Sequence, residues 1–420
     1  PILPIARERE VSVAVEQVRP VLAVTPSTWR GFDYADLWEG LGVRTLVCDR
    51  ALPEAEAALP ADPRPGPREH RWVFFSSGTT GVPKGARHTD ASVVAGPMAF
   101  CDRVGLTESD RYPIIFPFTH VGGIGTLFAQ LRTGASAVLD EQFDPARTIP
   151  LMTEHDVTIG AGGTPLVQLY LEHQRRQPDV PLLPHLRFCL AGAAPKPPTL
   201  HAAVREELGG RGCMSVYGLT EAPFLTMSAF DDDDHDLATT EGRAAAGAEL
   251  RVVALDGREC EPGEEGELRT RGPQVMLGYL DASLDGDAFD ADGFLRTGDL
   301  ARVDARGNVT IRGRIKEIII RKGENISAVE VEQVLAAHPA VAEVAVIGLP
   351  DPRTGERCCA VVVLRPDAEL TLDAVRGFAR ESGLATQKTP EQLEVVNAPP
   401  RNAAGKVVKH ELRAALAAAP

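Results

Sequence analysis

A run of glycines and hydroxyl residues at positions 76–85 constrains the fold of this 420-residue chain more than any other feature. It reads Ser-Ser-Gly-Thr-Thr-Gly-Val-Pro-Lys-Gly and follows residues 71–75, which have the apolar, aromatic pattern of a buried strand. A helix is expected to begin near Thr89 and Asp90. Glycines let the backbone approach an anion, while N–H groups, hydroxyls and a lysine supply donors and charge. The order strand, glycine-rich loop, helix predicts a phosphate-binding loop, although the string is not a Walker A loop.

The composition is that of an ordinary globular protein and narrows the range of partners. Hydrophobic residues make up 44% of the chain, and charged residues 25%. The formal net charge of -15 argues against a nucleic-acid partner, because few cations are available to neutralise phosphates. The seven cysteines lack metal-binding spacings, so free thiols and a cytoplasmic location are expected. We expect no membrane span, because no apolar run approaches the ~20 residues that one needs.

The order of the expected elements predicts an α/β protein. Alternating strands and helices predict a large N-terminal domain of helix-covered, mostly parallel sheets, whose ligands bind beyond the carboxyl ends of the strands. From about Glu249, short strands between Gly, Asp and Glu turns predict a small β subdomain. After these come a hairpin, a helix, two strands, a helix, a strand and a last helix, which predict a small α+β C-terminal domain. The expected domains are residues 1–315 and 316–420.

Three local expectations accompany this architecture. Asp144 followed by a proline predicts a helix start, since it places an N-cap acceptor before a proline at the first helical position. Residues 117–125 are expected to form a loop. The aspartate run at 231–234 is expected to be a solvated loop, because it lacks metal-ligand spacing.

Five strings occur in one order along the chain. They are residues 76–85, 217–221, 296–299, 313–325 and 400–406. Together they resemble the acyl-adenylate-forming (AMP-binding) superfamily, which contains acyl-CoA synthetases, aryl-CoA ligases, luciferases and peptide-synthetase adenylation domains. In that family the phosphate loop lies deeper in the chain, so part of the N-terminal domain is expected to be missing from this sequence.

The resemblance implies an enzyme that uses ATP, Mg²⁺ and coenzyme A to join a carboxylic acid to CoA through an acyl-AMP intermediate. From the family's motifs, the residues that bind the phosphates would be Ser76, Ser77, Gly78, Thr79, Thr80, Gly81 and Lys84. The adenosine would lie against Gly192, Ala193, Ala194, Tyr217 and Gly218. Asp299 would accept hydrogen bonds from the ribose hydroxyls, assisted by Arg314. Thr220 would contact a phosphate, and Glu221 would bind Mg²⁺, which prefers oxygen ligands.

The C-terminal domain would be a mobile lid that carries a catalytic lysine. By resemblance, Lys406 would bridge the substrate carboxylate and the phosphate, and Lys316 would be the hinge. The loop that serves thiol attack by CoA would contain Lys322, Gly323 and Glu324. Without the resemblance, Lys406 is typical of a solvent-facing lysine at a helix start, and Lys316 of a surface lysine in a strand.

The loop at residues 116–123 matches the one that lines the acyl pocket in the family. It lacks the aspartate with which amino-acid-activating relatives pair the substrate ammonium, which argues against an amino acid. The residues expected to line the pocket are His120, Val121, Gly122, Gly123 and Phe224. Small, apolar residues favour a hydrophobic fatty, alicyclic or steroid-derived acid. The sequence leaves open an acyl-AMP ligase that loads an acyl carrier protein, a non-catalytic adenylate-binding protein, and a homodimer.

Overall fold

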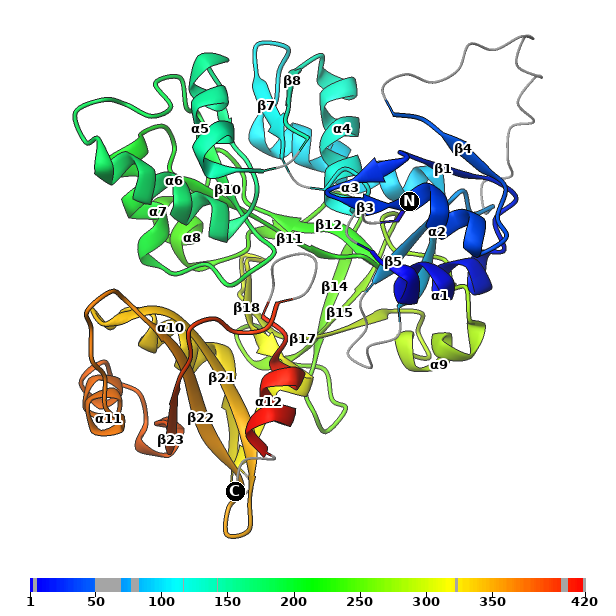
Figure 1. Cartoon of the computed structure of the whole chain (residues 1–420). Coiled ribbons are helices and arrows are strands. Elements are labelled where there is room, and N and C mark those ends of the chain that lie inside the picture. Colours follow the sequence, from blue (N-terminus) through cyan, green and yellow to red (C-terminus); the bar gives the residue numbers. More distant parts are fainter. Residues whose placement is uncertain are drawn as a thin grey trace, which may run out of the picture.

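The computed structural model describes residues 1–2, 6–49, 69–76, 83–115, 117–141, 143–321, 324–401 and 407–417, except for the side chains at positions 9, 324 and 325. Figure 1 shows a large lobe that ends with strand β18 and a smaller lobe built on the strands after it. Part of the expected catalytic set lies outside the described residues: Ser77, Gly78, Thr79, Thr80, Gly81, Lys322, Gly323 and Lys406.

The N-terminal segment is a small α/β unit with its own apolar cluster. Its elements are α1 (Glu8–Val18), β1 (Ala23–Thr25), β2 (Thr28–Trp29), β3 (Phe32–Asp33), α2 (Tyr34–Gly40) and β4 (Thr45–Val47). Strands β1 and β4 pair in parallel, whereas β2 and β3 form a hairpin. Val11, Ala23, Tyr34 and Trp38 pack together between them.

The predicted strand before the phosphate loop is present, but the loop does not lead directly into a helix. It joins β5 (Trp72–Ser76) to an antiparallel partner, β6 (Lys84–His88), and β16 (Gly278–Tyr279) pairs with the far side of β6. Helix α3 (Asp90–Val104) follows, and the Thr89 side chain caps it by accepting from the Ser92 N–H. Because Ser76 pairs with Lys84, both ends of the loop are held side by side.

A five-stranded mixed sheet forms the centre of the large lobe, in the order β13-β12-β11-β10-β9. Its strands are β9 (Ile159–Gly160), β10 (Phe188–Ala191), β11 (Cys213–Leu219), β12 (Ala222–Met227) and β13 (Arg243–Ala244). The β9, β10 and β11 strands are parallel as expected, whereas β12 and β13 run antiparallel. A separate parallel pair consists of β7 (Arg111–Ile114) and β8 (Ser136–Leu139).

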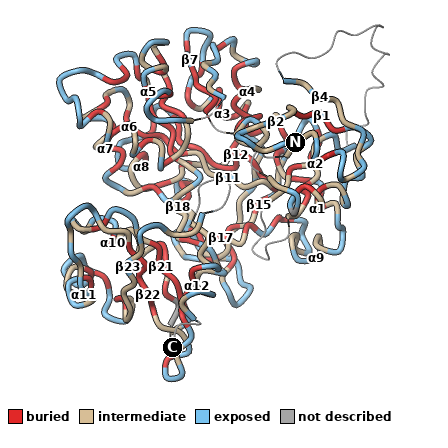
Figure 2. Tube along the Cα trace, viewed as in Figure 1, coloured by how far each residue is buried: buried red, intermediate tan, exposed pale blue. Residues whose placement is uncertain are grey.

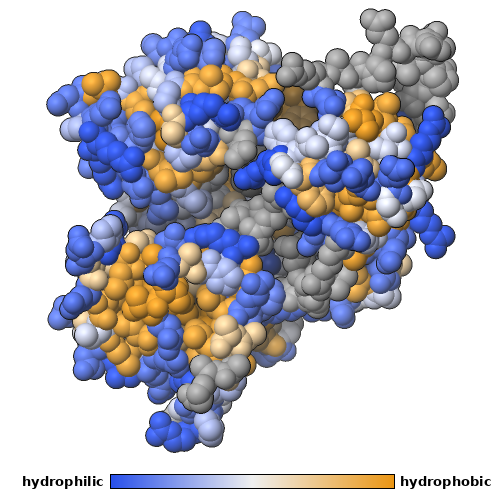
Figure 3. Space-filling model, in the orientation of Figure 1, coloured by the Kyte–Doolittle hydropathy of each residue, from blue (hydrophilic) through white to orange (hydrophobic). Residues whose placement is uncertain are grey.

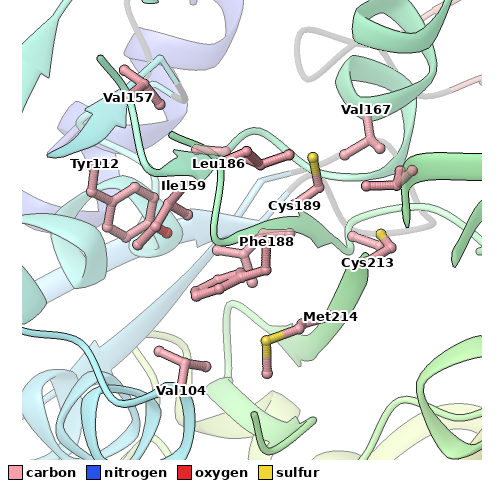
Figure 4. Close-up of a cluster of buried hydrophobic side chains, with 14 of the residues drawn as sticks. Val104, Tyr112, Val157, Ile159, Val167, Leu186, Phe188, Cys189, Cys213 and Met214 are labelled. Carbon is pink, nitrogen blue, oxygen red and sulfur yellow. The ribbon is translucent and has the colours of Figure 1, made fainter. Parts of the chain in front are cut away.

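Helices cover the central sheet and bury its side chains. They are α3, α4 (Val121–Thr133), α5 (Pro145–Glu154), α6 (Thr164–Arg176), α7 (Thr199–Ala203), a π-helical turn (Val204–Leu208) and α8 (Asp234–Thr239). Figure 4 shows Phe188 and Met214 on the side of Val104, and Cys189 and Cys213 on the side of Val167. This alternation is that of strands with both faces buried, and Figure 2 shows the buried centre and the exposed outer loops.

The expected β subdomain is a four-stranded antiparallel sheet in the order β14-β15-β17-β18. Its strands are β14 (Glu249–Val253), β15 (Glu265–Arg271), β17 (Leu295–Val303) and β18 (Val309–Arg314). A 3-10 turn (Ala282–Leu284) and α9 (Asp285–Ala288) lie between β16 and β17. Asp299 of β17 pairs with Arg314 of β18, which places two predicted site residues next to each other.

The small lobe follows the predicted order of elements. After a 3-10 turn (Ile315–Glu317) come β19 (Ile318–Arg321), β20 (Glu324–Ser327), α10 (Ala328–Leu335), β21 (Val341–Asp351), β22 (Gly355–Leu364), α11 (Leu372–Glu381), a 3-10 turn (Thr386–Lys388), β23 (Gln392–Val395) and α12 (Lys409–Ala417). Helices α10 and α11 contribute to the core on one face of the sheet, and α12 packs on the other. In Figure 3 hydrophobic residues gather over this lobe.

One local expectation is wrong, and another holds only in part. Residues 121–125 are helical, because the His120 side chain caps α4 and the glycines at the start of this helix pack closely against neighbouring segments. The aspartate run is a loop up to Asp233, and Asp231, Asp233 and Asp234 are exposed as expected, but Asp232 is buried and pairs with Arg243, and Asp234 begins α8, which Asp233 caps. The helix start at Asp144 is confirmed. In the part of the chain that the structure describes, no helix has the length and apolar character to cross a membrane.

Candidate active site

The hairpin between β11 and β12 is the part of the fold on which the predicted site residues converge. Tyr217 and Gly218 lie near the end of β11, and Thr220 and Glu221 form the reversal into β12. A Cβ at Gly218 would lie 2.6 Å from the Phe224 backbone nitrogen, so the two strands require glycine there. Tyr217 and Gly218 therefore lie within a strand, and only Thr220 and Glu221 lie in the turn after it.

The Glu221 carboxylate is buried at this reversal and is held by two hydroxyl groups. Its exposed fraction is 9%. Ser76 Oγ donates to Glu221 Oε1 at 3.1 Å, and Tyr279 OH donates to the same oxygen at 2.8 Å. Burial raises the pKa of Tyr279, and the neighbouring carboxylate raises it further, so the phenol stays protonated and donates. Among the residues with described side chains, no lysine, arginine or histidine forms an ion pair with Glu221.

Lys84 follows the phosphate loop, whereas Ser76 precedes it, and it lies near the same carboxylate. Its ammonium is 5.5 Å from the centre of the Tyr279 ring, within the range of a cation–π contact. The pairing of Ser76 with Lys84 brings a hydroxyl donor and a cation to one end of the β5–β6 hairpin. The structure therefore brings together Ser76, Lys84 and Glu221, as the resemblance implies.

His88 fixes the backbone at Thr220, directly before Glu221. Its Nε2 lies 2.9 Å from the Thr220 carbonyl oxygen, and its Nδ1 lies 3.0 Å from Ser92 Oγ. Because a carbonyl can only accept, Nε2 carries the proton in this contact. Burial lowers the pKa of His88 to about 4, so the ring is neutral at physiological pH.

A second carboxylate, Asp299 of β17, is held next to strand β11. Tyr217 OH donates to Asp299 Oδ2 at 2.6 Å, and Arg314 Nε lies 2.9 Å from Asp299 Oδ1. Asp299 raises the pKa of Arg314, while burial and the same carboxylate raise the pKa of Tyr217. A carboxylate held in this way can accept hydrogen bonds from a pair of ligand hydroxyls.

The turn after β10 presses against β11, as expected for a backbone wall. A Cβ at Gly192 would lie 2.5 Å from the Val216 carbonyl oxygen, and Ala193 has a φ of 61°. The Gly192 carbonyl accepts from the Thr164 N–H, and the Ala194 carbonyl from the Thr164 hydroxyl. These contacts place the turn next to the β11 strand that carries Tyr217.

The residues expected to line the acyl pocket surround the start of α4. His120 Nδ1 accepts from the Gly122 N–H at 3.0 Å, and Val121 is buried. A Cβ at Gly123 would lie 2.3 Å from the Pro117 carbonyl oxygen. A Cβ at Gly125 would lie 2.3 Å from Cε2 of Phe224, which has a φ of 51°. Phe224 therefore connects this helix to the hairpin that carries Glu221.

The expected hinge lies between a contact to the large lobe and a contact within the small lobe. Arg314, two residues before Lys316, is paired with Asp299. Glu317 directly follows Lys316, and its Oε2 lies 2.7 Å from Lys409 Nζ at the start of α12. The lobes also touch where Ser327 Oγ donates to the Arg312 carbonyl oxygen. Lys316 itself is exposed. Of the residues expected in the CoA loop, Glu324 pairs through its backbone with Arg321 in the β19–β20 hairpin.

The chemistry at Glu221 fits Mg²⁺ better than a metal held by protein ligands alone. The described residues contain no group of three or more histidines, cysteines or carboxylates that could bind a metal. Glu221 is a buried carboxylate that two hydroxyls orient and that forms no ion pair with a described side chain, which suits a hard cation that takes its other ligands from phosphates and water.

Two residues of the site were not identified from the sequence, His88 and Tyr279. Their hydrogen-bond partners are 132 and 58 residues away along the chain, so no local pattern reveals the contacts. A signal was available for His88, because it lies four residues after the lysine of the phosphate loop. Tyr279 follows a glycine in a short, buried segment that resembles many strand ends.

Comparison with known proteins agrees with this site. Residues 1–280 match the AMP-binding enzyme family, and residues 330–406 match the AMP-binding enzyme C-terminal domain. The chain therefore belongs to the AMP-binding enzyme family.

Two relatives and one solved structure illustrate the similarity. The chain is 38% identical to the medium-chain fatty-acid–CoA ligase of Escherichia coli over 346 residues, which are 81% of this chain and 60% of the relative. It is 39% identical to the 3-[(3aS,4S,7aS)-7a-methyl-1,5-dioxo-octahydro-1H-inden-4-yl]propanoyl:CoA ligase of Mycobacterium tuberculosis over 399 residues, which are 94% of this chain and 73% of the relative. ATP-bound MatB from Rhodopseudomonas palustris has a TM-score of 0.88 and 28% identity, over 100% of this chain and 83% of that one.

Proposed function

We propose that this protein is an ATP-dependent carboxylic acid:CoA ligase that acts through an acyl-AMP intermediate on a hydrophobic acid. The observation that carries the proposal is the pair of buried carboxylates at the β11–β12 hairpin: Glu221 in its turn, and Asp299 bonded to Tyr217 of β11. One is oriented by hydroxyls next to the phosphate loop, and the other by Tyr217 and Arg314. The family match and the two CoA ligases among the relatives support the same reaction.

The reaction has two displacement steps. A carboxylate oxygen of the acid attacks the α-phosphorus of ATP, the bond from that phosphorus to the bridging oxygen breaks, and pyrophosphate leaves. The CoA thiol then loses its proton and attacks the acyl carbon, and AMP leaves with its oxygen. The first step brings two anions together, so donors and positive charge around the phosphates lower its barrier.

Each site residue has a role in this proposal. Asp299 binds the ribose hydroxyls with Arg314 beside it, and the wall at residues 192–194 lies against adenine with Tyr217 and Gly218. Ser76 and Lys84, with the loop between them, bind the phosphates, and Thr220 contacts a phosphate. Glu221 binds Mg²⁺, which would neutralise charge on the phosphate oxygens.

The small lobe completes the site. We assign residues 1–315 and 316–420 to the two domains, with Lys316 as the hinge between them. The contacts of Arg314 to the large lobe and of Glu317 to α12 support a pivot in this segment. Lys406 bridges the carboxylate and the phosphate during adenylation, and the loop at Lys322, Gly323 and Glu324 serves the thiol step. A Lys406→Ala variant should lose about 10²- to 10³-fold in adenylation rate.

The acid is hydrophobic in this proposal. The start of α4 offers His120 and small or apolar groups, and Phe224 adds an aromatic ring. The relatives include a ligase named for medium-chain fatty acids and one named for a bicyclic propanoate, which supports a fatty, alicyclic or steroid-derived acid. The proposal includes a cytoplasmic location, and light scattering of the purified protein would test for a homodimer.

Product analysis by mass spectrometry tests the reaction. The protein is incubated with MgATP, CoA and panels of fatty, alicyclic, aromatic and steroid-side-chain acids, and a parallel arm replaces CoA by a phosphopantetheinylated carrier protein. The proposal predicts an acyl-CoA from a hydrophobic acid, formed about 10²-fold or more slowly by Asp299→Asn. Acyl transfer to the carrier protein alone would refute CoA as the acceptor, and no acyl product in either arm would refute the ligase assignment.

A further inference from the structure

Tyr279 is the last residue of β16 and lies in the wall of the phosphate site. Only 8% of it is exposed, and it packs with Ala86, Ala222, Met276 and Leu295. Strand β16 pairs with β6, so the position of the ring is fixed relative to the strand that begins with Lys84. The backbone nearby is tied to the same place, because the Met276 N–H donates to the Glu221 carbonyl at 2.9 Å.

This one side chain contacts two charged residues in different ways. Its hydroxyl donates to Glu221 Oε1 at 2.8 Å, while its ring lies 5.5 Å from the Lys84 ammonium. The second donor to Glu221, Ser76 Oγ, binds the same oxygen. Within the described part of the chain no side-chain donor bonds to Oε2, which leaves that oxygen able to act as a ligand.

We propose that Tyr279 is a positioning residue that orients the Glu221 carboxylate for Mg²⁺ and holds Lys84 beside it. The inference rests on the proposed function, in which Glu221 binds Mg²⁺ and Lys84 binds phosphate. Groups that hold a metal ligand in place commonly contribute tenfold to a hundredfold to metal affinity.

A phenol suits this task better than a cationic side chain. An arginine or lysine on Glu221 would compete with the metal, because it would neutralise the charge that attracts the cation. A hydroxyl donor fixes the orientation of the carboxylate and leaves its negative charge in place. The buried ring adds rigidity, since a tyrosine has only two side-chain torsions and this one is packed on several sides.

The two contacts can be separated by substitution. Tyr279→Phe removes the hydroxyl and keeps the ring beside Lys84, whereas Tyr279→Leu removes both. Ser76→Ala removes the other hydroxyl from Oε1. Tyr34→Phe is the matched control, because Tyr34 is also a buried tyrosine whose hydroxyl is hydrogen-bonded, to Arg7 and Ala6 in the N-terminal cluster.

The test measures ATP binding by calorimetry without any acid, once with excess Mg²⁺ and once with EDTA. Tyr279→Phe should reduce the Mg²⁺-dependent gain in ATP affinity about tenfold or more and leave the affinity in EDTA within about twofold of wild type. Tyr279→Leu should also weaken binding in EDTA. Tyr34→Phe should change neither value. A purely structural role of Tyr279 would instead lower the ATP affinity with Mg²⁺ and the ATP affinity in EDTA together in Tyr279→Phe, and would contradict the inference.

The outcomes separate this inference from the proposed function. A wild-type protein that does not bind ATP, or binds it without any effect of Mg²⁺, would overturn the proposed function and the inference with it. A wild type with the Mg²⁺ effect and a Tyr279→Phe variant that keeps it in full would overturn the inference alone. If Tyr279→Phe does not fold, Tyr279→Leu, which also lacks the hydroxyl, decides in its place, and an unchanged Mg²⁺ effect there would overturn the inference.

Discussion

Replacing Lys409 by methionine is expected to loosen the small lobe, because it leaves two partly buried carboxylates without their shared cation. Lys409 Nζ lies 2.7 Å from Glu317 Oε2 and 2.8 Å from Glu332 Oε1. The side chains of Lys409 and Glu332 are only 17% and 15% exposed. This cluster connects α12 to α10 and to the turn that contains Lys316.

The magnitude follows from burial. Removing one partner of a buried ion pair typically costs about 3–5 kcal/mol, because the charge that remains is desolvated and unpaired. Glu332 also accepts from the Val346 N–H at 2.7 Å, which offsets part of this cost. An exposed pair contributes only about 0–1 kcal/mol, and the pair of Arg376 with Asp373, which is 97% exposed, provides the control.

Hydrogen exchange followed by mass spectrometry is the appropriate assay. The three tryptophans lie at positions 29, 38 and 72, so fluorescence does not report on the small lobe. The Lys409→Met variant should exchange the amides of α12 and β21 on the order of 10²- to 10³-fold faster than wild type. Asp373→Asn should leave these rates nearly unchanged. The double variant Lys409→Met/Glu332→Gln should recover most of the protection.

The effect should also depend on pH. Burial raises the pKa of Glu332, and Lys409 opposes that shift. Without Lys409 the native state binds a proton at Glu332 more readily than the unfolded state does, so acidification stabilises the variant relative to wild type. The loss of stability in Lys409→Met relative to wild type should be largest near neutral pH and should shrink as Glu332 becomes protonated. Equal exchange in the variant and wild type at neutral pH, or a deficit that grows in acid, would refute the reasoning.

Three further substitutions test other parts of the structure. Asp299→Asn should weaken ATP binding about 10²-fold or more in calorimetry, because the charge-assisted hydrogen bonds expected from Asp299 to the ribose contribute about 1.5–3 kcal/mol each. Gly125→Ala should lower the free energy of unfolding by about 1–3 kcal/mol, because the added methyl would lie 2.3 Å from Phe224 Cε2. Gly377→Ala is the control and should be neutral or stabilising, because no atom lies within 4 Å of its added methyl. His88 has a folded-state pKa of about 4 against an ordinary value of 6.5, so the unfolded state binds its proton first and stability should fall by about 3 kcal/mol as the pH drops from 6.5 to 4. This loss should be smaller in His88→Gln, as measured by urea denaturation.

Local patterns in the sequence predicted much of the fold. The strand before the phosphate loop, the helix capped by Thr89 and the order of elements in the small lobe are all confirmed. Each of these is specified by residues close together in the chain, such as an N-cap or an apolar run. The sequence also predicts Glu221 and Asp299 as site residues, because the motifs that contain them are specific to the family.

The remaining features depend on contacts between distant segments. Residues 121–125 contain three glycines, which disfavour a helix in isolation, yet α4 forms because the lack of side chains allows close packing on Pro117 and Phe224. The sequence does not show that Lys84 begins a strand, since β6 forms by pairing with β5 and β16. Tyr279 belongs to the site only because that pairing places it beside Glu221.

ATP–pyrophosphate exchange tests the central claim most directly, because it reports acyl-AMP formation without depending on the thiol acceptor. The account predicts exchange by the wild-type protein that requires Mg²⁺ and a hydrophobic acid, and a loss of about 10²-fold or more in a folded Asp299→Asn variant. A folded wild-type protein that binds ATP but shows no acid-dependent exchange with fatty, alicyclic, aromatic or steroid-side-chain acids would contradict it.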